Sequence, residues 1–144
     1  MIQQVIDGII AALYDHFREE YPYFTDNTEQ GITPGSFSVI CVRPKQTQFL
    51  GNRYYREHPM CVYYFPKSTG DYSETNAMIE KLFSILEYIT VSGDLVRGTN
   101  MNPHVEDGVL VFSVDYNFFV RKVEAEQDNM ENLEMRENVN GEET

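Results

Sequence analysis

The spacing of apolar residues predicts an amphipathic helix in each of two segments of the chain. In residues 2–20, and again in residues 71–88, apolar side chains recur every three or four positions and so share one helical face. Pro22 ends the first segment, because the residue before a proline disfavours the helical conformation. Asp71 and Glu74 have the spacing of a capping box at the start of the second, with Asp in place of the usual Ser or Thr. We therefore expect two helices that each bury one face.

Other segments are rich in β-branched and aromatic residues and bounded by turn residues, and so predict strands: residues 23–27, 36–42, 53–65, 95–105 and 109–121. The last one alternates a wholly apolar set with a mixed set, as in a strand with one face on a core. Asp107-Gly108, a favoured tight-hairpin dipeptide, joins the last two strands. Pro59 predicts either a bulge in its strand or a position whose missing N–H faces away from the ladder. Residues 45–52 are interpreted as a polar loop carrying the apolar pair Phe49-Leu50.

This order of elements predicts the fold class. Helices do not alternate with single strands, which favours an α+β fold. We expect a mixed or mainly antiparallel sheet of about four to five strands, with the two amphipathic helices packed on one face. The chain has 144 residues, which suits one domain over residues 1–123. Residues 124–144 have no strand pattern and little apolar content, and we expect an acidic, disordered tail.

The net charge of −12 is unevenly distributed along the chain. Residues 1–123 carry a net charge of −5, and residues 124–144 carry −7. Sequence-specific nucleic-acid binding needs a basic face, and this balance argues against it. The cations that could cluster are interleaved with Glu57 and neutral residues: Arg43, Lys45, Arg53 and Arg56.

Motifs that carry chemistry are missing from the sequence. It has no Walker-type loop, no dinucleotide-binding glycine fingerprint, no HExxH and no GxSxG. His16 lies among acidic residues at a helix end, but no second His is near it, so we expect a solvated helix end instead of a metal site. His58 and Cys61 are three apart on a strand and would face opposite sides, too far apart for a nucleophile and its base. We expect no enzymatic activity, no metal and no cofactor.

The sequence also bears on the compartment. Cys41 and Cys61 lie in apolar runs and are interpreted as small buried hydrophobic residues, without a disulfide framework. The first residues lack the basic and apolar regions of a signal peptide. No apolar run approaches the roughly 20 residues of a membrane-spanning helix. We expect a cytoplasm-like environment for the folding of this chain.

Short motifs stand in a fixed order along about residues 2–122: IQQVIDGI at 2–9, EQG at 29–31, FLGNRYYR at 49–56, YFP at 64–66, LEYI at 86–89, GDLVRGT at 93–99 and EDGVL at 106–110. Together they resemble a family of bacteriophage tail terminator proteins, which phage and prophage tail operons encode. None of the motifs is catalytic. Residues 123–144 lie outside the resemblance.

The resemblance implies a structural protein that forms a hexameric ring on the last ring of the tail tube. The ring would stop tube polymerisation and provide the surface for head attachment. The implied partners are other copies of the chain, the tail tube protein, a sheath protein where the tail has one, and the head–tail connector protein. DNA would pass through the ring without sequence-specific binding, and no membrane is involved. The protein would be assembled in the bacterial host cytoplasm and reside in the virion.

A ring subunit needs a heterologous, closing interface. Candidates for contacts between subunits or with the tube lie in the polar loop and in the hairpin of residues 95–104: Gln48, Phe49, Leu50, Arg53, Tyr54, Arg97, Asn100 and Met101. Two other interpretations stay open at this stage. One is another phage neck, head-completion or baseplate assembly protein. The other is a small-molecule enzyme or ligand-binding domain that uses the tyrosine-rich sheet.

Overall fold

The computed structural model describes residues 1–25, 33–68, 72–124 and 131–135. These residues form two helices and eleven strands. In chain order the elements are α1 (Ile2–Phe17), β1 (Tyr23–Phe24), β2 (Ser36–Cys41), β3 (Lys45–Leu50), β4 (Arg53–Glu57), β5 (Pro59–Phe65), α2 (Tyr72–Ile85), β6 (Tyr88–Val91), β7 (Asp94–Arg97), β8 (Thr99–Glu106), β9 (Val109–Asp115), β10 (Phe118–Glu124) and β11 (Glu131–Met135).

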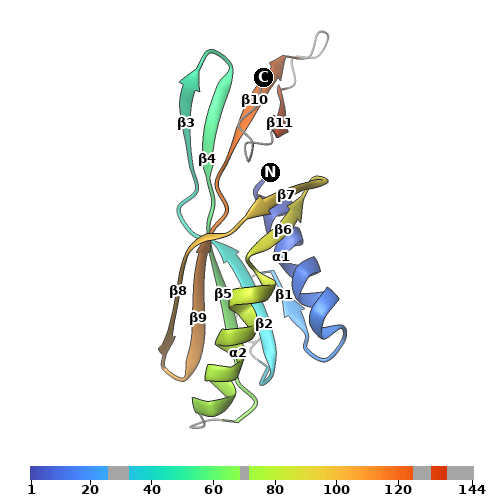
Figure 1. Ribbon diagram of the computed structural model, residues 1–144, viewed down its shortest axis with the longest axis vertical. Helices are drawn as coiled ribbons and strands as arrows, with labels where there is room; N and C mark the ends of the chain where they lie inside the picture. Colours follow the sequence, from blue (N-terminus) through green and yellow to red (C-terminus); the bar gives the residue numbers. More distant parts are fainter. Residues whose placement is uncertain (26–32, 69–71, 125–130, 136–144) are drawn as a thin grey trace.

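The strands are arranged in three sheets (Figure 1). The main sheet has the order β1-β2-β5-β9-β8, the second sheet has the order β11-β10-β4-β3, and β6 pairs with β7 alone. All neighbours are antiparallel except β1 and β2. The α+β class with mostly antiparallel pairing is confirmed. The expectation of about four to five strands is wrong, because long strand-like segments are split and additional hairpins form.

Two long segments each contribute one strand to the main sheet and one to the second sheet. Residues 53–65 divide at His58 into β4 and β5, and residues 109–124 divide at Tyr116-Asn117 into β9 and β10. At the division, the His58 backbone N–H donates to the Asn117 side-chain oxygen at 2.9 Å, and the Tyr116 N–H donates to the His58 carbonyl at 3.1 Å. The His58 ring Nδ1 lies 2.9 Å from the Tyr116 carbonyl oxygen. These hydrogen bonds replace the regular strand-to-strand ladder where the two segments pass from one sheet to the other.

The hydrophobic core lies between the main sheet, α1 and the β6–β7 hairpin. Val5, Ile9 and Leu13 of α1 are fully buried, as the helical spacing predicted. A Cβ at Gly8 would lie 2.5 Å from the Thr90 carbonyl oxygen, so α1 approaches β6 closely only because residue 8 is a glycine. Met78 and Leu82 place α2 in the same core. Packing of both helices on a single sheet face stays a prediction.

Several boundaries differ from the sequence-based expectation. The second helix ends at Ile85, and residues 88–91 form β6 instead of a last helical turn. The expected loop at residues 45–52 contains strand β3. Residues 131–135, in the expected acidic tail, pair with β10 as β11, and tail residues 125–130 and 136–144 lie outside the described residues. Neither α1 nor α2 is long and apolar enough to cross a membrane.

Candidate functional site

The second sheet projects from the body as an arm, which we define as β3, β4 and β10 (Figure 1). All six residues of β3 are exposed. Gly51, with a φ of 61°, turns the chain between β3 and β4, and the Gln48 side chain donates to its carbonyl at 2.8 Å. The Lys122 N–H donates to the Asn52 carbonyl at 2.8 Å and so ties the tip of the hairpin to β10. These hydrogen bonds fix the hairpin, although none of the described elements covers β3.

An aromatic cluster occupies one face of the arm. Phe49 and Leu50 are 56% and 67% exposed, the highest values for phenylalanine and leucine in the described chain. The Phe119 ring lies 5.1 Å from Phe49 and 4.9 Å from Tyr55, measured between centroids. A shallow hollow of about 370 Å³ beside these rings is lined by Thr47, Gln48, Phe49, Tyr55, Glu57 and Phe119. We call Phe49, Leu50, Tyr55, Phe119 and Arg53 the arm patch.

Arg53 lies at the centre of the arm patch. Its guanidinium carbon is 5.6 Å from the Phe49 ring centroid and 5.2 Å from that of Phe119. Its Nε is buried and has no hydrogen-bond partner, and in the described parts of the chain no carboxylate lies within ion-pair distance of it. A partly desolvated cation held between aromatic rings is well placed to bind a carboxylate supplied from outside.

The arm is basic, whereas the remainder of the chain is acidic. The three arm strands, residues 45–50, 53–57 and 118–124, carry five Lys or Arg and two Glu, a net charge of +3. Residues 1–42 and 58–117 carry four Lys or Arg and fourteen Asp or Glu, a net charge of −10. Because β4 pairs with both β3 and β10, cations that are dispersed in sequence share one sheet.

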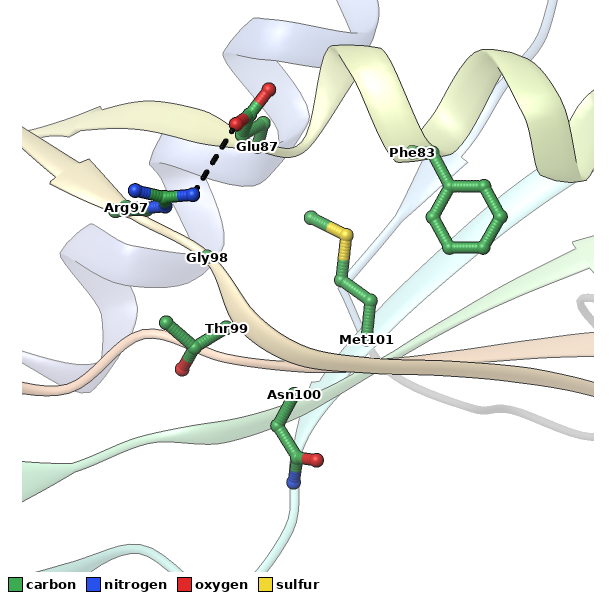
Figure 2. A pocket seen from close by; sticks show the side chains of 7 residues that line it. All are labelled: Phe83, Glu87, Arg97, Gly98, Thr99, Asn100 and Met101. Carbon is green, nitrogen blue, oxygen red and sulfur yellow. Dashed lines mark ion pairs between the residues drawn. The ribbon is translucent and has the colours of Figure 1, made fainter.

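A second surface is a groove at the carboxyl end of α2, with a volume of about 640 Å³ (Figure 2). The chain after α2 is fixed here, because the Tyr116 hydroxyl donates to the Leu86 carbonyl at 2.6 Å and the Gly98 N–H donates to the Glu87 carbonyl at 2.7 Å. A Cβ on Gly98 would lie 2.7 Å from the Leu86 carbonyl oxygen, so this crossing requires glycine. The groove residues are Phe83, Glu87, Arg97, Gly98, Thr99, Asn100 and Met101.

The groove combines apolar walls with an acidic edge. Figure 2 shows Met101 on the side of β8 that faces Phe83, whereas Asn100 points to the other side. Phe83 is 38% exposed and packs edge-on against Phe112 at 5.5 Å. Glu87 and Arg97 approach to 3.7 Å, and both side chains are about half exposed. An ion pair this exposed contributes about 1 kcal/mol or less, so Glu87 stays available to another cation.

The structure divides the sequence-predicted residues between these two surfaces. Gln48, Phe49, Leu50 and Arg53 lie on the arm, and Tyr54 packs against the core from its other face. The groove brings together the remaining three: Arg97, Asn100 and Met101. Sequence reasoning missed Tyr55, Phe119, Phe83 and Glu87. The mixed face of the 109–121 alternation already placed Phe119 away from the core, but only the strand pairing brings it beside Tyr55. The interface role of all these residues stays a prediction.

His58 is the most perturbed titratable group whose charge changes near neutral pH. Burial is the main cause that lowers its pKa from 6.5 to about 4; the positive charges of Arg56 and the N-terminal amine act in the same direction, and the hydrogen bond to the Tyr116 carbonyl opposes them. Its buried Nε2 has no hydrogen-bond partner among the residues that the structure describes. Elsewhere in the described chain, no three His, Cys, Asp or Glu side chains converge where they could hold a metal ion.

Taken together, these features define an α+β protein with a projecting antiparallel arm and two exposed, partly apolar surfaces. A family model described as phage tail terminator protein matches residues 4–128, which include the whole arm and the groove. The chain belongs to this phage tail terminator family. Comparison with curated proteins gave no match. One solved structure aligns over 86% of this chain and 97% of its own, with 15% identity and a TM-score of 0.44.

Proposed function

We propose that the protein is a structural tail terminator, without enzymatic activity, that forms a hexameric ring capping the tail tube. The ring stops tube polymerisation and offers its outer face for head attachment. The observation that carries this proposal is the family match over residues 4–128. Two dissimilar exposed surfaces on one subunit support it, because a closed ring is built from heterologous contacts.

The partners follow from this role. Each subunit meets other copies of itself, the ring meets the tail tube protein, and a sheath protein adjoins it in tails that have one. The head–tail connector binds the opposite face, and DNA passes through the ring without sequence-specific contacts. The protein is assembled in the host cytoplasm and is carried in the virion.

The test is to polymerise tail tube protein with and without the purified chain. We expect light scattering to report a hexamer and electron microscopy to show tubes that stop growing once capped. The matched control is Tyr72→Ser, which removes an aromatic side chain that is 65% exposed and outside both surfaces. Tubes that lengthen equally with and without the wild-type chain would contradict the terminator role.

A further inference from the structure

We propose that the arm patch of one copy docks in the groove of a second copy, with Arg53 binding the acidic edge of that groove. This inference rests on the proposed ring and names the contact that closes it. The contact is heterologous: each subunit contributes its arm to one neighbour and its groove to the other.

Apolar complementarity is the first argument. The arm patch presents Phe49 and Leu50 on a projecting hairpin, with more than half of each side chain exposed. The groove presents Phe83 and Met101 in a concave surface of about 640 Å³. A projecting pair of apolar side chains and a recess with apolar walls are the shapes that bury surface when they meet, and aromatic anchors in pockets dominate binding energies at interfaces.

Charge complementarity is the second argument. The arm strands carry a net charge of +3, and residues 1–42 and 58–117, which include the groove, carry −10. Arg53 has no carboxylate partner among the described residues, and its Nε is buried without a hydrogen bond. The groove edge offers the Glu87 carboxylate, which lies 3.7 Å from the Arg97 guanidinium and is about half exposed. Docking would place Arg53 near the Glu87 carboxylate of the neighbouring copy, whereas no described carboxylate of its own chain pairs with it.

Geometry requires that the two surfaces come from different copies. The arm and α2 extend in opposite directions along the long axis of the molecule (Figure 1). The strands at the base of the arm are fixed by the His58, Tyr116 and Asn117 hydrogen bonds, so the arm cannot fold back onto α2. A patch and a groove that cannot meet within one chain form a head-to-tail contact, which generates a ring when the rotation closes.

A basic, aromatic arm also has the chemistry of a nucleic-acid surface. We favour a second copy because the remaining chain is strongly acidic and would repel phosphates, and because a groove of matching character exists on the same molecule. DNA binding by the arm is therefore treated as an outcome of the test.

The experiment mixes two variants of the full chain that each lack one side of the contact. The arm variant is Phe49→Ser with Leu50→Ser. The groove variant is Phe83→Arg, which would repel the Arg53 of a docked neighbour. The new arginine side chain is long enough to reach solvent in the monomer. Tyr72→Ser is the control. Thermal unfolding verifies that all are folded, and analytical ultracentrifugation measures mass for each variant alone and for the mixture.

We expect each variant alone to be monomeric, with self-association weakened about tenfold or more, as for hot-spot truncations. The mixture should give a one-to-one heterodimer and no ring, because one intact arm and one intact groove remain. The control should assemble like the wild-type chain. Arg53→Gln alone should weaken assembly and reduce its dependence on salt, since it removes the cation but keeps most of the side chain.

Three results would overturn the proposal. One is a mixture that stays monomeric while the wild-type chain forms rings. Another is a wild-type chain that is monomeric at every concentration. The third is an arm variant that assembles normally but no longer binds a short DNA duplex. Failure of the proposed function is separable: wild-type rings that contain the arm–groove contact but leave tube length unchanged would refute the terminator role alone.

Discussion

The arm and the main sheet are built from the same two long segments, yet they differ in what covers them. In the main sheet, β5 and β9 are covered by helices and the β6–β7 hairpin, and Val62, Phe112 and Val114 are fully buried. In the arm, the continuations β4 and β10 pair with β3, all of whose residues are exposed. The comparison shows that one continuous segment can place half its length in the core sheet and the other half in a sheet with an open surface.

Two adjacent residues show how sharp this change is. Phe118 is 2% exposed and stacks on the His58 ring at 4.9 Å, whereas Phe119 lies on the arm patch against Tyr55 and Phe49. Successive residues of a strand face opposite sides, so the first side faces the body and the second faces solvent. We therefore expect aromatic side chains on the uncovered side to contribute less to the stability of the domain than those that face the core.

The largest expected effect tests the covered half of this comparison. Phe112→Ala should lower the free energy of unfolding by about 3 to 5 kcal/mol, because it empties a fully buried site in β9. Phe119→Ala, on the continuation of the same segment, should cost about 1 kcal/mol or less. Urea unfolding of both variants measures the difference. Equal losses would show that the arm patch belongs to the core.

The second prediction concerns the joint between the main sheet and the arm, which we define as His58, Tyr116 and Asn117. The folded state keeps His58 neutral with a pKa of about 4, while the unfolded chain protonates near 6.5. Between these values the unfolded chain binds more protons, so stability is complete above pH 6.5 and falls as the pH drops toward 4, by about 3 kcal/mol. Urea unfolding across pH 4 to 7 should show this extra loss in the wild-type chain relative to His58→Gln.

An independent measurement follows the protonation of His58 directly. The chain has three His residues, and His16 and His104 lie at exposed positions. In an NMR titration the His58 ring should keep its neutral chemical shifts down to about pH 5, well below the ordinary histidine pKa of about 6.5. A His58 that becomes protonated near pH 6.5 would show that the joint admits water.

Much of the covered half could be predicted from the sequence. The helical spacing placed α1 and α2, and strand β2 was found over nearly its whole length. Asp107-Gly108 forms the expected tight turn, with both residues at positive φ, 55° and 78°. These features succeed because burial on one face leaves a periodic pattern in the sequence. Before Pro59 the expected strand 53–65 is instead divided into β4 and β5, and Pro59 begins β5 in regular register with Asp115.

The arm and the groove could not be predicted in the same way. Strand β3 has no buried side, so its residues carry no alternation, and they were interpreted as a loop. The basic character of the arm depends on pairing of β4 with β10, which brings Arg53 opposite Arg121 across 68 residues of sequence. The groove depends on two carbonyls after α2 that accept bonds from Tyr116 and Gly98. Long-range register decides each of these features.

A third prediction addresses one hydrogen bond at the joint. Asn117→Ala removes the acceptor of the His58 backbone N–H, which lies in a fully buried residue. We expect a loss of about 1 to 3 kcal/mol, the cost of an unsatisfied buried donor. Asn52→Ala is the matched control, because its bond to the Lys122 carbonyl is exposed and 3.3 Å long. If both variants lose the same free energy of unfolding, the hydrogen bond at the joint contributes no more to stability than the one at the tip of the arm.

The smallest expected effect on stability is at the tip of the arm. Phe49→Ser removes a side chain that is 56% exposed and that lies against the Phe119 ring and the Arg53 guanidinium. The free energy of unfolding should change by about 0.5 kcal/mol or less. The same variant should weaken self-association strongly, because Phe49 is exposed in the monomer and would become buried in the proposed arm–groove contact. Thermal unfolding and sedimentation of one preparation compare the two effects. A variant that loses stability and assembly in proportion would place Phe49 in the core and remove the distinction between arm and main sheet.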